Sequence, residues 1–191
     1  MKHIVKSVIL ISIFIFGSCK PSPQKAEKYY DDILEPIEEV FKKEDVLISL
    51  INAEMDKSIN DSSSSIINID TIIADTAYKK LDMAFSNLQI QVNISINKMK
   101  SLPDFDKSNT MKTKAIDLME EYNAVCDNEY PGLIEIIKIP EANYTLENDD
   151  KFLALSESID NKLQNKISAL LKEMKQFARK YNFEIKKDTI N

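Results

Sequence analysis

The sequence predicts an all-α fold, an antiparallel up-down four-helix bundle. Only 2 of the 191 residues are glycine, too few for the tight turns of an all-β fold. Four segments place apolar residues three and four positions apart, which keeps one face of a helix apolar. Prolines and polar runs separate these segments, and such short connections favour antiparallel neighbours. A long coiled coil or an oligomeric assembly is the alternative, although strict heptads are missing.

The N-terminal residues have the pattern of an export signal. Lys2 and Lys6 precede an apolar run from Val8 to Phe16. This run is shorter than the ~20 residues that a membrane helix needs. The sequence Phe16-Gly17-Ser18-Cys19 resembles the bacterial lipobox, whose cysteine receives diacylglycerol and becomes the first residue of the mature protein.

We therefore expect a cleaved lipoprotein signal peptide over residues 1–18 and a lipidated tether over 19–23, with Cys19 as the lipidated residue. A plain secretory signal and a membrane anchor are the alternatives. Residues 24–185 then form a single four-helix bundle domain, and 186–191 a flexible C-terminus. Lys20, rather than Asp, follows the cysteine, which favours the outer membrane over retention at the inner one.

The first helix begins at Ser22-Pro23, because serine is a good N-cap and proline suits the first helical position. Its apolar stripe continues to Met55, and Pro36 is expected to bend the helix or to start it afresh. Residues 59–69 break this pattern, and Asn60-Asp61 with the serine run 62–65 predicts a loop. A second helix is expected from Asp70 or Thr71 up to Pro103.

The third helix carries an apolar stripe from Met111 to Ile137, and Pro131 inside it predicts a kink or a break. Pro140 ends this element. After a loop over 141–147, the acidic segment Asn148-Asp149-Asp150 is expected to cap the last helix, which continues to Tyr181. Five positions should be buried at the helix interfaces: Leu88, Val92, Tyr122, Leu163 and Leu170.

The residue types exclude several classes of function. His3 is the only histidine and would leave with the signal, so histidine-dependent triads and the usual zinc sites are not expected. The formal net charge of −6 disfavours nucleic acid as a partner. We expect no catalytic residue, no metal ligand and no cofactor, and hence no enzyme. Cys126 is either a reactive thiol or, as its place in an apolar stripe favours, a small core residue.

Two groups of residues are candidates for recognition. Four aromatic residues could line a ligand pocket between helices, although their helical spacing favours a core role: Tyr29, Tyr30, Phe41 and Phe177. The loops 59–69 and 140–148 should meet at the end of the bundle remote from the tether, and they carry Ile67 and Tyr144. Loops on a rigid scaffold often carry recognition, so these two residues are candidate partner contacts, with capping of the core end as the alternative.

The lipobox is followed by the segments AEKYYDDILEPIEEVFKKEDVLISLI and FARKYNFEI. With these segments the chain resembles a family of helical surface lipoproteins of Bacteroidetes and spirochaetes that has no established activity. The resemblance implies a helical envelope protein. We therefore expect a non-enzymatic cell-envelope lipoprotein, bound to the membrane through Cys19, with a structural or protein-interaction role and an envelope protein as partner. The alternative is a binding module for a small apolar or peptide ligand between the helices.

Overall fold

The computed structural model describes residues 21–60, 70–108 and 110–185, with side chains described at 21–56, 76–108 and 110–185. Every regular element in these ranges is helical, so the prediction of an all-α fold is confirmed. Several predictions lie outside the described residues: the signal peptide over 1–18, the lipidated Cys19, the contact candidate Ile67 and the C-terminus over 186–191.

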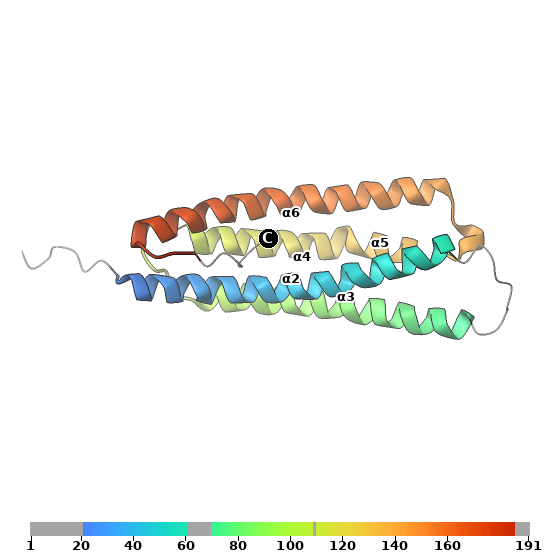
Figure 1. Ribbon diagram of the computed structural model, residues 1–191, viewed down its shortest axis with the longest axis horizontal. Coiled ribbons are helices and arrows are strands. Elements are labelled where there is room, and N and C mark those ends of the chain that lie inside the picture. The colour runs from blue at the N-terminus through green and yellow to red at the C-terminus, as the bar shows by residue number, and fades with distance from the viewer. Residues whose placement is uncertain (1–20, 61–69, 109, 186–191) are drawn as a thin grey trace, which may run out of the picture.

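The described chain forms an elongated helical bundle (Figure 1). Its longest helix has 38 residues, which corresponds to about 57 Å. The elements in chain order are α2 (Pro23–Asn60), α3 (Asp70–Ser101), α4 (Met111–Asn128), α5 (Tyr130–Ile137), the 3-10 helix η1 (Glu141–Asn143) and α6 (Leu146–Tyr181). The most extensive packing is between α2 and α3 and between α4 and α6.

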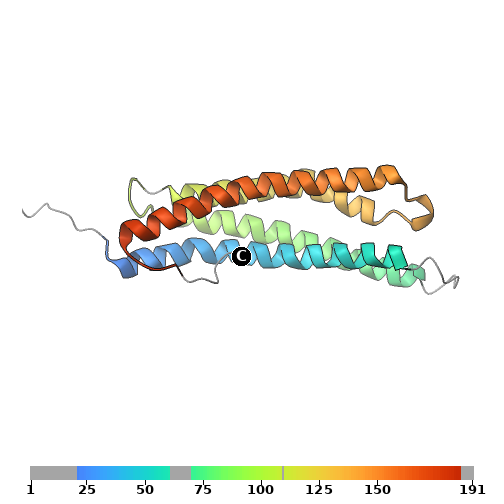
Figure 2. The ribbon, with the colours of Figure 1, turned by 45° about the horizontal axis from the view of Figure 1, so that its top comes forward.

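The two ends of the bundle are composed of different segments (Figures 1 and 2). One end, here called the base, contains the start of α2, the connection between α3 and α4, and the end of α6. The opposite end, here called the tip, contains the end of α2, the start of α3, η1 and the start of α6. The base and the tip are therefore separated by nearly the full length of α2.

The core runs along the bundle axis and receives side chains from every long helix. The five predicted interface residues are all buried, with Leu88 and Val92 fully inaccessible. This confirms the prediction of which helix faces point inward. The largest fully buried side chains are Tyr122, Tyr130, Ile33, Ile37, Leu47, Leu81, Leu88, Met99, Met111, Leu118, Met119 and Leu170.

The two helix-internal prolines have different effects. α4 ends at Asn128 and α5 begins at Tyr130, so the predicted break at Pro131 is confirmed. Glu129 lies at this break, and its buried carboxylate accepts hydrogen bonds from Lys162 and Ser158 of α6 at 2.5 and 3.2 Å.

α2, in contrast, continues through Pro36 as one helix. Of the two expected effects of this proline, a bend or a fresh helix start, the fresh start is therefore wrong. The Pro36 carbonyl oxygen accepts a hydrogen bond from the buried Ser95 hydroxyl of α3 at 2.7 Å. This hydrogen bond ties α2 to α3 at the proline.

The predicted start of the last helix is also wrong. α6 begins at Leu146 rather than after Asn148, and Thr145 is its N-cap. The Asn148 side-chain oxygen accepts hydrogen bonds from the Thr145 backbone N–H at 2.9 Å and from its hydroxyl at 2.8 Å. Asn148 is thus the third residue of the helix, where it completes a capping box with Thr145, and the acidic residues after it lie inside the first turns.

Candidate functional site at the tip

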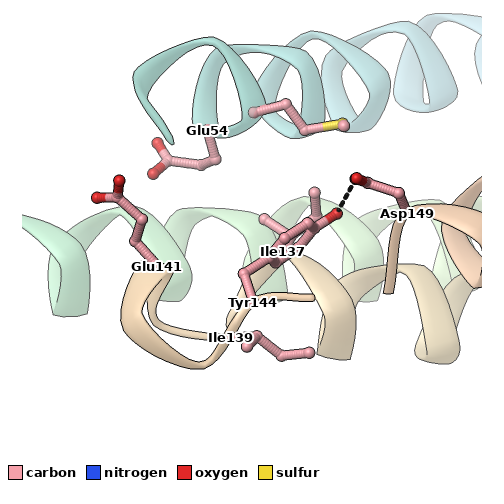
Figure 3. Close-up of a pocket in the computed structure, with 7 residues that line it drawn as sticks. Glu54, Ile137, Ile139, Glu141, Tyr144 and Asp149 are labelled. Atoms are coloured by element: carbon pink, nitrogen blue, oxygen red, sulfur yellow. Dashed lines mark hydrogen bonds between the residues drawn. The ribbon is translucent and has the colours of Figure 1, made fainter. Parts of the chain in front are cut away.

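A cavity of about 270 Å³ opens at the tip of the bundle (Figure 3). It lies near the lower limit of the ~300–1,000 Å³ that is typical of small-molecule pockets. Its described lining comes from α2, α5, the connection that contains η1, and α6: Glu54, Met55, Ile137, Ile139, Glu141, Tyr144 and Asp149.

The local sequence explains how one wall of this pocket forms. Pro140 precedes the single turn of η1, which leads to Tyr144 in an extended conformation. The capping box then starts α6 and places Asp149 in its first turn. The Tyr144 hydroxyl donates a hydrogen bond to Asp149 at 2.9 Å (Figure 3). Partial burial, together with this hydrogen bond to an acidic group, raises the pKa of the Tyr144 hydroxyl, which therefore stays a neutral donor at physiological pH.

The floor of the pocket is apolar. Met55 is at the tip end of the apolar stripe of α2, and Ile137 is the last residue of α5. Both side chains are half-buried and pack against the core. Ile139, also half-buried, follows just after α5. The pocket floor is therefore continuous with the hydrophobic core, so the scaffold holds it rigidly.

The rim of the pocket is acidic. Glu54 and Glu141 lie on one side and Asp149 on the opposite side, beside the Tyr144 hydroxyl (Figure 3). None of the described lining residues is Lys, Arg or His. The lining therefore combines apolar side chains with acidic groups, which gives the site two distinct recognition chemistries.

The structure places one of the two predicted partner contacts at this site. Tyr144 lines the pocket, whereas Ile67 lies outside the described residues. Sequence reasoning did not single out Glu54, Ile139 or Glu141 as site residues. A signal was present for the floor, because Ile139 extends the apolar run of α5 beyond the helix end, up to Pro140.

The four aromatic residues considered for a pocket between helices do not surround a common space. Tyr29 and Phe177 lie near the base with ring centroids 5.9 Å apart, and Tyr30 packs edge-on against Phe183 at 5.5 Å. Phe41 instead packs against Tyr122 at 6.0 Å, farther along α2. All four belong to the core or pack against it. The core interpretation of these rings is therefore the one that the structure supports.

A half-buried polar cluster in the middle of the bundle was not predicted. Glu44 of α2 accepts hydrogen bonds from the hydroxyls of Tyr122 and Tyr130, both at 2.6 Å. Burial raises the pKa of the Glu44 carboxyl, while the two tyrosine hydrogen bonds oppose this effect. The sequence contained a signal, because Glu44 is three residues from both Phe41 and Leu47 and so lies on the apolar face of α2.

Cys126 lies on the same face of α4 as Tyr122 and is fully buried. Its surroundings raise the pKa of the thiol to about 12, mainly through burial and then through the nearby Glu44 carboxylate. A thiol that stays protonated is a poor nucleophile. The interpretation of Cys126 as a core residue is therefore the one that the structure favours.

Among the residues that the structure describes, no group of three or more His, Cys, Asp or Glu side chains has a metal-binding arrangement. Nor does any helix within the described ranges combine the length and the apolar character that a membrane span requires. Comparison of the chain with protein-family models, with curated protein sequences and with solved structures found no match.

Proposed function

We propose that this protein is a non-enzymatic binding module of the bacterial cell envelope, tethered to the membrane by lipid at Cys19, which binds its partner or ligand through the tip pocket. The proposed topology is an antiparallel up-down four-helix bundle. The observation that carries the proposal is the position of the pocket. Glu54 and Met55 lie more than 30 residues along α2 from its start at Pro23, a separation of about 45 Å.

This separation matters because the tether is short. If lipid is attached at Cys19, the few residues before Pro23 keep the base close to the membrane. The rigid helices then hold the pocket away from the lipid surface, where an envelope protein or a soluble ligand has access to it. The lipobox-like residues before Cys19 support the lipid anchor. The proposed location of the anchored protein is the outer membrane.

A binding role also fits the chemistry of the pocket better than a structural role alone. A bundle end that only closes the core needs apolar caps, whereas this end keeps a cavity with three carboxylate side chains around it. The polar connection with η1 sits on a floor that belongs to the core, which is how rigid scaffolds present recognition loops.

The proposal can be tested by methyl NMR on the full chain, with ¹³C-labelled Met and Ile methyl groups, in nanodiscs. A set of small neutral, cationic and anionic compounds is added one at a time. We expect some of them to shift the methyl signals of Met55, Ile137 and Ile139. The signals of Met83 and Ile90, exposed on α3 away from the pocket lining, serve as internal controls.

Two variants make the test specific. Tyr144→Ser removes the ring that lines the pocket, and we expect it to abolish the shifts. Leu146→Ser is the matched control, because Leu146 is 82% exposed near the tip and does not line the pocket. The proposal is wrong if no compound shifts the pocket methyls, or if the shifts extend equally to Met83 and Ile90.

A further inference from the structure

We propose that the tip pocket binds an organic cation, namely an ammonium or guanidinium group on a short apolar chain. This inference rests on the function proposed above and adds the chemical class of the ligand. Such a group occurs on a lysine or arginine side chain of a protein and on a free alkylamine. Both sources share one chemistry, and the experiment below separates them.

The size of the pocket limits what it can hold. A cavity of about 270 Å³ is smaller than most sites for drug-sized ligands. It has room for one long side chain or one small amine, but not for a nucleotide or a large cofactor. The apolar floor of Met55, Ile137 and Ile139 suits the methylene groups of such a chain.

The charges at the rim determine which sign of charge the ligand carries. No cationic partner of the Glu141 carboxylate occurs among the described side chains, and the hydrogen bond that Asp149 accepts there comes from the neutral Tyr144 hydroxyl. Two negative charges beside an apolar cavity attract a cation and repel a carboxylate or a phosphate. Tyr144 also lines the pocket, and an aromatic ring attracts a cation that approaches its face.

The arrangement favours an organic cation over a metal ion. Calcium and magnesium need six or more oxygen ligands around one point. The carboxylates here lie on opposite sides of the pocket (Figure 3), and the described acidic residues form no metal-binding group. A ligand with a charged end and an apolar body, in contrast, contacts the rim and the floor at the same time.

The test compares three probes of equal length on the full chain in nanodiscs: n-pentylamine, n-pentanol and pentanoate. Binding is followed by the methyl shifts of Met55 and Ile137. We expect pentylamine to bind at least tenfold more tightly than pentanol, and pentanoate to bind least. Because the attraction is between charges at an accessible rim, the affinity for pentylamine should fall as salt is raised, while that for pentanol should not.

The variants Glu141→Gln and Asp149→Asn each remove one charge and keep the size of the side chain. We expect each to weaken pentylamine binding about tenfold and to leave pentanol binding unchanged. Glu147→Gln is the matched control, because Glu147 lies in the same first turn of α6 as Asp149, is exposed and does not line the pocket. If Asp149→Asn fails to fold, Glu141→Gln alone provides the test, because Glu141 is exposed.

Equal binding of pentanol and pentylamine, or full pentylamine affinity in Glu141→Gln, would overturn the inference and leave the pocket as a binding site. Absence of methyl shifts with all three probes would overturn the inference and count against the proposed function as well. A second arm compares pentylamine with an acetylated, amidated lysine peptide. Tighter binding of the peptide identifies a protein segment as the source of the cation, and tighter binding of the free amine identifies a small molecule.

Discussion

Replacing Glu44 with alanine should destabilise the bundle strongly, although Glu44 lies far from the tip pocket. The carboxylate accepts one hydrogen bond from Tyr122 and one from Tyr130, both at 2.6 Å. Both tyrosines are almost fully buried, so in Glu44→Ala their hydroxyls lose their partners. An unsatisfied buried polar group costs about 1–3 kcal/mol. Two such groups give a loss of about 2–6 kcal/mol, toward the lower end because a half-buried charge is removed as well.

The assay is urea unfolding of the full chain followed by circular dichroism, with the free energy of unfolding obtained by linear extrapolation. Glu44→Gln is the control, because its amide can accept a hydrogen bond from one tyrosine and donate one to the other. We expect Glu44→Gln to be about as stable as the wild type at neutral pH. A loss below about 0.5 kcal/mol in Glu44→Ala would refute the reasoning, because both hydroxyls would then have found other partners.

The wild type and Glu44→Gln should also differ in how the free energy of unfolding depends on pH. Burial raises the pKa of Glu44 in the folded state, above the value of about 4.3 that applies to an unfolded chain. The folded protein therefore binds the proton more tightly, so this group adds stability below pH ~4 that is lost as pH rises through the folded-state pKa. The free energy of unfolding should fall more steeply with rising pH in the wild type than in Glu44→Gln. Parallel pH profiles of the two proteins would contradict a raised pKa of Glu44 in the folded state.

Two further predictions concern the anchor and the core. In Cys19→Ala we expect loss of palmitate labelling and of membrane retention. The lipid anchor would be ruled out if the wild type took up no palmitate label and the variant stayed in the membrane fraction as the wild type does. Leu88→Ala and Leu163→Ala should each cost about 2–5 kcal/mol in urea unfolding, because both side chains are buried between helices. Losses below about 0.5 kcal/mol at both positions would show that these helix faces do not form the core.

The helix faces could be predicted from the sequence because burial repeats every three or four residues along each segment. Leu88 and Val92 illustrate this, since both follow from spacing alone and both are buried. The break at Pro131 was predictable for a similar local reason, because proline lacks the N–H that the preceding turn needs. These features depend on few residues and on no distant partner.

The features that sequence reasoning missed depend on contacts between distant segments or on competing local ones. Glu44 has its partners 78 and 86 residues away, so its position on an apolar face indicated burial but not what would satisfy the carboxylate. The start of α6 was misplaced because Thr145 and Asn148 both suit an N-cap, and only their hydrogen bonds show that Thr145 takes this role. The pocket forms only where α2 lies beside the connection that follows α5. These segments are far apart in the sequence, so local patterns do not reveal that they meet.

The central polar cluster and the tip pocket share the same two structural elements, and this links the stability of the bundle to its proposed function. Glu44 and Met55 both belong to α2, about 16 Å apart along the helix. Tyr130 and Ile137 are the first and last residues of α5. The hydrogen bond from Tyr130 to Glu44 therefore limits sliding of α5 along α2. Such sliding would change the distance between Met55 and Ile137, which form the pocket floor. The half-buried Glu44 carboxylate thus contributes to the alignment of the two helices that carry the pocket floor.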